Sequence, residues 1–362
     1  MRRCPRFSLA LGLLLLATPV LAQPQTLTPA QQRAKAKAQN VPEIPYESVP
    51  NFLKFPTNLY LGEGIGIATN SKGHIFVYTR SQETRLFEFD KTGTFIRELG
   101  EGLYGFAFAH AVRVDAQDNI WAVDEGTNTI IKFNPEGKVV MLIGRKSEAV
   151  GGLEETPAPG SPIPPAQPYR LSRPTDIAWD AAGNSFISDG YGNSRVVKYD
   201  KNGRFVKDTG SKGSLPGQLS TPHAIATDAQ GNVYVADRGN SRIQVFSNDL
   251  VLRAIYSNVG APWAVCITPG PHQYLYSSNS NPDSNNSEIA AVTGEIYKME
   301  LDGTILGKFG KPGKLLGEFG TVHQIDCRNP DEISVVEITN WRAQRILLHP
   351  AAAAAGATGA KK

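Results

Sequence analysis

Residues 173–206 read RPTDIAWDAAGNSFISDGYGNSRVVKYDKNGRFV, and residues 221–253 read TPHAIATDAQGNVYVADRGNSRIQVFSNDLVLR. Both stretches hold an alternating apolar run, a turn of the Asp-Ala-x-Gly-Asn kind, and a second run that ends near an Asp. A loop with Asn-Ser-Arg then leads to a third run. Alternation with a period of two, bounded by Gly, Asn and Asp turns, is typical of short antiparallel strands. Two adjacent copies predict a fold built from repeated sheets.

The same pattern recurs, more loosely, in four further places, which begin near Ile65, His110, Trp263 and His323. Six units of roughly 40–50 residues, each with four strands, are typical of a six-bladed β-propeller. We therefore expect an all-β chain with almost no helix. The sixth unit runs out of chain after its third strand. A segment near residues 52–54 is expected to supply the fourth strand and close the ring, so that no raw sheet edge is exposed.

The N-terminal segment, residues 1–22, has the composition of a secretory signal peptide. Three basic residues, Arg2, Arg3 and Arg6, precede an apolar run from Phe7 to about Leu16, and Val20-Leu21-Ala22 then offers small residues for cleavage. A membrane anchor is the alternative, but the run is shorter than the ~20 residues needed to span a bilayer. We expect cleavage after Ala22 and a secreted or periplasmic protein.

The rest of the chain divides into three parts. Residues 23–50 are rich in Gln, Pro, Ala and Lys and are expected to form a linker or arm. Residues 51–350 hold the repeats and are the expected propeller. Residues 351–362 are of low complexity and are expected to be a disordered tail.

The charge balance limits the partners. The chain has 37 Lys+Arg and 34 Asp+Glu, and the three arginines of the signal segment account for the excess. A neutral mature chain without a basic cluster argues against nucleic acid and against an anionic membrane surface as partners. We expect a monomer without a membrane span that takes a small-molecule or peptide substrate.

Two cysteines, Cys266 and Cys327, lie beyond the signal segment, early in two neighbouring repeats. Export permits a disulfide, but two cysteines do not make a disulfide framework. A disulfide and two buried thiols are both consistent with the sequence.

Function is expected from residues that depart from the repeat. Aligned on the start of the first strand, the six units place these residues at one position: Ile65, His110, Thr175, His223, Trp263 and His323. Histidine therefore occupies this position on alternate blades. The first strand of a blade lines the central channel, so the three imidazoles are expected to converge. Three imidazole ligands and an open fourth position are the usual layout of a catalytic Zn²⁺, and other first-row metals accept imidazole too. The alternative is that each histidine only hydrogen-bonds within its own blade.

Three more residues are expected on the same rim of the channel. Tyr191 interrupts the loop after the second strand of its unit, and Arg80 and Arg238 end second strands of two other units. A phenol beside a metal ion and a cation can act as a base. An Arg can orient a carboxylate with two hydrogen bonds. The alternatives are loop packing for the tyrosine and blade-to-blade ion pairs for the arginines.

These motifs resemble a known family. Residues 174–246, with DGYGNSR and PHAIA followed by ADRGNSRIQ, closely resemble the peptidyl-α-hydroxyglycine α-amidating lyases, and a weaker likeness covers residues 61–348. The family consists of six-bladed propellers of NHL-type repeats. Its members bind a channel Zn²⁺ through three histidines and cleave an N-(α-hydroxyalkyl) amide into an amide and glyoxylate. The resemblance implies a zinc-dependent carbon–nitrogen lyase of the secreted, bacterial type.

The resemblance also implies roles for single residues. The three channel histidines would be the zinc ligands, Tyr191 the base that takes the substrate hydroxyl proton, and Arg80 and Arg238 part of the substrate site. The position two before the third histidine is usually Met in the family and is Thr321 here, which alters the expected lining of the substrate site. The next residue after that histidine is usually an Asp that binds a structural Ca²⁺. It is Gln324 here, so Ca²⁺ is left open.

Two other functions stay open. One is a non-catalytic NHL propeller that binds a peptide or cell-envelope ligand on its rim, which has no need of the histidines. The other is a metal-dependent hydrolase, for example a lactonase. Such sites usually rely on carboxylate ligands, and the aligned channel position holds no acidic residue. The chain shows no copper monooxygenase domain, so we expect a separate oxygenase or a different substrate.

Overall fold

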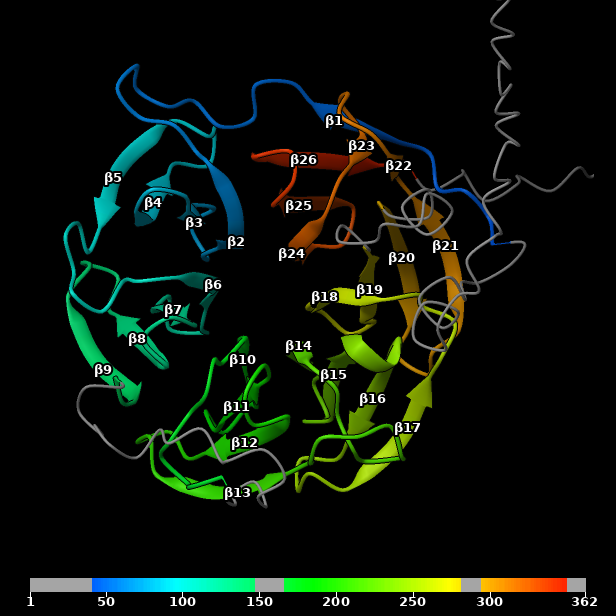
Figure 1. Ribbon diagram of the computed structural model, residues 1–362. Helices are drawn as coiled ribbons and strands as arrows, with labels where there is room; N and C mark the ends of the chain where they lie inside the picture. The colour runs from blue at the N-terminus through cyan, green and yellow to red at the C-terminus, as the bar shows by residue number, and fades with distance from the viewer. Residues whose placement is uncertain (1–40, 147–165, 281–293, 350–362) are drawn as a thin grey trace, which may run out of the picture.

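The computed structural model describes residues 41–146, 166–280 and 294–349. These residues form six four-stranded antiparallel sheets around a central channel, which confirms the six-bladed β-propeller (Figure 1). One short 3₁₀ helix, η2 (Arg238–Asn240), is the only helix within the described ranges, and no helix there is long and apolar enough to cross a membrane. The predicted signal peptide and tail lie outside the described residues.

Blades one to five are meanders of consecutive strands, with the first strand at the channel and the fourth on the outside (Figure 1). Blades one and two consist of β2 (Glu63–Thr69), β3 (Ile75–Arg80), β4 (Thr84–Phe89), β5 (Phe95–Leu99), β6 (Ala109–Val114), β7 (Ile120–Asp124), β8 (Thr129–Phe133) and β9 (Val139–Gly144). Blades three and four consist of β10 (Asp176–Trp179), β11 (Ser185–Asp189), β12 (Arg195–Tyr199), β13 (Phe205–Thr209), β14 (Pro222–Thr227), β15 (Val233–Asp237), β16 (Arg242–Phe246) and β17 (Leu252–Tyr256). Blade five and the small parallel pair after it consist of β18 (Pro262–Ile267), β19 (Tyr274–Asn279), β20 (Glu295–Glu300), β21 (Ile305–Phe309), β22 (Lys311–Pro312) and β23 (Glu318–Phe319).

The sixth blade joins the two ends of the repeat region. Its sheet contains, from the channel outward, β24 (Val322–Asn329), β25 (Glu332–Glu337), β26 (Arg342–Leu348) and β1 (Tyr46–Val49). Tyr46 pairs with Leu348, and Val49 pairs with Arg345. The N-terminal side of the chain therefore closes the ring, as expected. The prediction of residues 52–54 as the closing strand is wrong, because the strand lies earlier, inside the segment assigned to an arm.

Residues 52–54 have a different place, against the outer strand of blade one. The amide of Lys54 donates to the carbonyl of Gly93 at 2.8 Å, and the amide of Phe95 donates to the carbonyl of Lys54 at 3.2 Å. Upstream of β1, the amide of Ile44 donates to the carbonyl of Lys308 on β21 at 2.7 Å. The N-terminal segment thus binds the edges of blades five, six and one in succession, and this can be followed along the blue trace of Figure 1.

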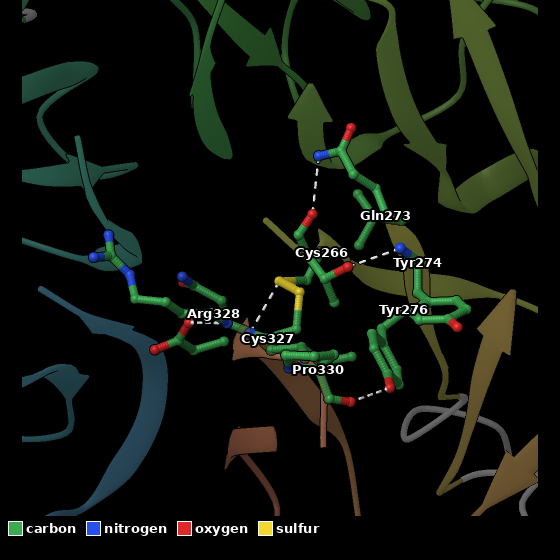
Figure 2. The surroundings of a disulfide bond; sticks show 12 residues. Cys266, Gln273, Tyr274, Tyr276, Cys327, Arg328 and Pro330 are labelled. Atoms are coloured by element: carbon green, nitrogen blue, oxygen red, sulfur yellow. Dashed lines mark hydrogen bonds between the residues drawn. A yellow bond between two sulfur atoms is a disulfide. The ribbon is translucent and has the colours of Figure 1, made fainter. Parts of the chain in front are cut away.

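The two cysteines form a disulfide between the innermost strands of blades five and six (Figure 2). Cys266 lies on β18 and Cys327 on β24, with an S–S distance of 2.02 Å and 6.0 Å between the Cα atoms. Nearby, the hydroxyl of Tyr276 donates to the carbonyl of Pro330 at 2.7 Å and also links the two blades. The structure therefore shows a disulfide and not two free thiols.

Loss of this disulfide should destabilise the propeller. It closes a chain separation of 61 residues, for which restriction of the unfolded chain is worth about 4 kcal/mol. We expect the double variant Cys266→Ser/Cys327→Ser to unfold at lower denaturant concentration than the wild type, and dithiothreitol to lower the wild-type midpoint only. Equal midpoints for variant and wild type under non-reducing conditions would contradict the stabilising role.

Candidate metal centre

Three histidines from alternate blades meet in the channel. His110 on β6, His223 on β14 and His323 on β24 are each the second residue of an innermost strand. The ring centroids lie 4.7, 4.7 and 4.8 Å apart, which is close to an equilateral triangle. Their candidate ligand atoms all lie within 4.8 Å of one another, and the side chains are buried. The predicted convergence is confirmed.

One type of hydrogen bond orients all three rings. The Nδ1 atoms lie 2.6, 2.7 and 2.8 Å from backbone carbonyl oxygens in the pairs His110–Thr175, His223–Trp263 and His323–Ile65. These partners are the residues that the repeat alignment placed at the same position of the next blade. A carbonyl oxygen can only accept, so each Nδ1 carries the proton and each Nε2 carries a lone pair. The hydrogen bond therefore fixes both the tautomer and the direction of the ring.

The Nε2 atoms have the properties of metal ligands. Those of His110 and His223 are buried and have no hydrogen-bond partner. Burial lowers the pKa of His323 to about 3 and holds the pKa values of His110 and His223 well below the ordinary range, so the rings are neutral at pH 7. A buried acceptor without a partner costs free energy. Three neutral imidazoles that present lone pairs to one point fit a first-row metal ion.

Arg113 closes the channel beyond the triad. Its guanidinium donates to both carboxylate oxygens of Asp176, at 2.9 and 2.6 Å. It also donates to the carbonyls of Ile325 and Val265, each at 3.3 Å. These partners belong to blades three, six and five, so the side chain spans the channel. The opposite rim, where the second strands of the blades end, lies on the other side of the triad.

Tyr191 lies on that rim, beside the triad, as expected. Its ring centroid is 5.5 Å from that of His110 and 6.1 Å from that of His223. The guanidinium carbons of Arg173 and Arg238 lie 4.5 and 5.5 Å from the centre of its ring. Burial raises the pKa of the Tyr191 phenol, and the charge of Arg238 offsets part of this increase. The position suits a residue that contacts a ligand of the triad.

The two predicted arginines differ in how their charges are used. Arg80 donates through Nε to Glu63 at 3.0 Å and through Nη1 to the carbonyl of Ala109 at 3.3 Å. Its ion pair with Glu63 lies within blade one, and a longer one, 3.9 Å, reaches Glu125 of blade two. Arg238 stacks on Trp263, with 4.1 Å from the guanidinium carbon to the ring centre, and pairs with no carboxylate in the described part of the chain. Arg238 is therefore the better placed of the two to bind an anionic group.

Thr321 and Gln324 mark where the chain departs from the family pattern. Thr321 is fully buried, and its hydroxyl has no hydrogen-bond partner. The Gln324 amide nitrogen donates to the carbonyls of Ile67 and Val112 at 3.0 and 2.5 Å, and its oxygen accepts from the Val112 amide at 3.2 Å. Ca²⁺ requires oxygen ligands. Here the carbonyls of Ile67 and Val112 already accept hydrogen bonds from the Gln324 amide nitrogen. In this arrangement Gln324 does not fit a Ca²⁺ ligand, and its amide links blades six, one and two instead.

Glu125 is a site residue that the sequence patterns did not reveal. It directly follows β7 and is only 4% exposed. Its Oε1 accepts hydrogen bonds from Nε and Nη2 of Arg173, the first at 2.7 Å. Its Oε2 lies 3.8 Å from Nε2 of His110 and 3.9 Å from Nη1 of Arg80. Burial raises the pKa of Glu125, and Arg173 opposes the increase. The sequence did hold a signal, because Glu125 occupies the loop position that Arg238 occupies in blade four.

Comparison with known proteins shows which proteins this chain resembles. The NHL repeat family matches residues 219–246. Rat peptidylglycine alpha-amidating monooxygenase is 27% identical over 308 residues, which are 73% of this chain and 29% of that protein. A probable peptidyl-alpha-hydroxyglycine alpha-amidating lyase of Caenorhabditis elegans is 28% identical over 218 residues, 52% of this chain and 57% of that protein. The chain is an NHL-repeat propeller distantly related to the amidating lyases. It spans less than a third of the rat protein and just over half of the nematode one.

Solved structures support the fold. Virginiamycin B lyase from Staphylococcus aureus superposes with a TM-score of 0.56 at 13% identity, over 85% of this chain and all of that one. At this identity the likeness shows the propeller fold alone.

The depressed histidine pKa values predict a pH dependence of the metal-free protein. The unfolded chain binds protons below pH 6.5, whereas folded His323 binds one only near pH 3. Stability is therefore lost as pH falls through this window. From pH 7 to 5 the loss from His323 alone is about 2 kcal/mol. Denaturant unfolding in the presence of a chelator, at pH 7 and at pH 5, measures this loss. His323→Gln should reduce the difference in unfolding free energy between the two pH values. If the substitution left this pH-dependent difference in unfolding free energy unchanged, the burial of a neutral His323 ring would be contradicted.

The Gln324 hydrogen bonds predict a calcium-independent fold. Added Ca²⁺ or a calcium chelator should leave the wild-type melting temperature unchanged. Gln324→Ala should lower the free energy of unfolding by about 1–3 kcal/mol, because two buried carbonyls lose their donors. Differential scanning calorimetry checks both. A clear rise in melting temperature with Ca²⁺ would show that a calcium site exists.

Proposed function

We propose that this chain is an exported, zinc-dependent lyase that cleaves the C–N bond of an N-(α-hydroxyalkyl) amide of the peptidyl-α-hydroxyglycine type. The observation that carries the proposal is the triad, in which three rings are fixed through Nδ1 and present Nε2 lone pairs to one point. A non-catalytic scaffold has no need of this arrangement. The distant relationship to amidating lyases supports this choice of reaction.

The rim residues divide the remaining tasks. Arg238 binds the substrate carboxylate, because its guanidinium is half-buried and faces no acidic partner among the described residues. Arg80 supports the same subsite from blade one. Tyr191 lies beside both the triad and Arg238. A zinc ion at the triad and the charge of Arg238 would favour its phenolate, which takes the proton of the substrate hydroxyl.

The reaction then needs no further reactant. As the hydroxyl loses its proton, the carbon–oxygen double bond forms and the carbon–nitrogen bond breaks. The leaving amide nitrogen takes up a proton, so the products are the amide and glyoxylate. A zinc ion at the triad would act as a Lewis acid towards the substrate oxygens.

Two features support export of the protein. Residues 1–22 have the pattern of a signal peptide, and the Cys266–Cys327 disulfide is stable in an oxidising environment. We therefore propose that the protein acts in the periplasm or outside the cell.

A direct assay tests the proposal. Purified mature protein with Zn²⁺ should release glyoxylate from an N-acyl-α-hydroxyglycine. His223→Ala should lose the metal and reduce the rate at least about 100-fold. Tyr191→Phe should keep the metal and lower kcat by about 10²–10⁴-fold. The matched control is His272→Ala, since His272 is exposed and pairs with Glu300 away from the channel. A fully active His223→Ala protein would refute the role of the triad.

A second candidate is a metal-dependent hydrolase. The sequence argued against it because no acidic residue occupies the aligned channel position. Glu125 brings a buried carboxylate to the triad from a loop, which weakens that argument. Hydrolysis of simple lactones by the zinc-loaded protein, with no glyoxylate release, would favour this function over the lyase.

A further inference from the structure

Glu125 presents one carboxylate oxygen, Oε2, to the triad. Both nitrogens that Arg173 uses bond to Oε1, so Oε2 accepts no hydrogen bond within the described residues. The residue is deeply buried, with only 4% of its surface exposed. A buried carboxylate oxygen without a donor is costly unless positive charge lies close to it.

Arg80 meets this need only in part, through a long ion pair. Arg80 Nη1 is 3.9 Å from Oε2, beyond hydrogen-bond range, and its Nε already pairs with Glu63 at 3.0 Å. Nε2 of His110 lies at a similar distance from Oε2, 3.8 Å. Because Nδ1 of His110 is the protonated nitrogen, Nε2 presents a lone pair. Two acceptors therefore lie near each other without a proton between them, an arrangement that a shared cation would stabilise.

We propose that Glu125 is the fourth protein group of the metal centre and offers Oε2 to the ion held by the three histidines. This inference rests on the proposed metal-dependent function. Arg173 acts as its positioning residue, since it holds Oε1 and turns Oε2 to the channel. A carboxylate added to three neutral imidazoles lowers the net charge of a divalent centre by one. It also extends the range of metal ions that the site can bind from Zn²⁺ to harder ions such as Mn²⁺ or Fe²⁺.

Metal affinity of Glu125→Gln tests the proposal. The amide keeps the size of the side chain and can still accept from Arg173, but it lacks the charge. Competition of Zn²⁺ with a chelating indicator should show binding that is about 10–100-fold weaker than in the wild type. The visible absorption of the Co²⁺-loaded protein should also change, because the ligand field changes. Both readouts are independent of catalysis.

Two variants separate metal binding from structural support. Glu63→Gln removes the other carboxylate that pairs with Arg80 and should bind Zn²⁺ like the wild type. Arg173→Met removes the positioning guanidinium but leaves the carboxylate, so Zn²⁺ affinity should fall less than in Glu125→Gln. If Glu125 only anchored Arg173, Arg173→Met would weaken Zn²⁺ binding as much as Glu125→Gln does.

The outcomes separate the role of Glu125 from the proposed function. If the wild type binds no metal, the proposed function fails. If His223→Ala abolishes binding while Glu125→Gln binds within about twofold of the wild type, only the role of Glu125 is overturned. Should Glu125→Gln fail to fold, Glu125→Asp keeps the charge on a shorter arm. An unchanged Co²⁺ spectrum and affinity in Glu125→Asp would then count against direct participation.

Discussion

The hydrogen bond from each histidine Nδ1 to the carbonyl of the next blade is the interaction on which the site depends. It joins His110, His223 and His323 to Thr175, Trp263 and Ile65. Since a carbonyl cannot donate, the proton must stay on Nδ1 and the lone pair on Nε2 must face the channel axis. The same contact joins adjacent blades, so the chemistry of the site and the packing of the ring are coupled. A small shift between blades would move all three ligand atoms.

Ring closure protects this geometry. β1 completes blade six, and the residues on either side of it bind the edges of blades five and one. The disulfide between β18 and β24 and the Gln324 amide hold neighbouring innermost strands at the channel itself. Arg113 closes the channel beyond the triad, which leaves one rim for a ligand. The proposed chemistry therefore belongs to the rim that carries Tyr191, Arg238 and Glu125.

The sequence predicted the fold and the triad because both follow from the repeat. Alternation and turn chemistry recur in six units, and aligning them placed the histidines on alternate blades. The closing strand was misplaced because β1 belongs to a repeat unit that is split between the two ends of the repeat region. The sequence next to β1 therefore contains no complete copy of the repeat with which it could be aligned. Glu125 was missed because the alignment followed the first strands, whereas this residue reaches the triad from the loop after a second strand. The three carbonyl and amide contacts of Gln324 depend on the spacing of three blades, which no sequence pattern records.

The central claim is that one metal ion binds at the three Nε2 atoms. Anomalous diffraction from crystals of the zinc-loaded protein, collected on both sides of the zinc absorption edge, tests it most directly. The account predicts a single strong difference peak between His110, His223 and His323, with Oε2 of Glu125 directed towards it. A zinc-loaded crystal without a peak at this point, or with the Nε2 atoms hydrogen-bonded to water, would contradict it.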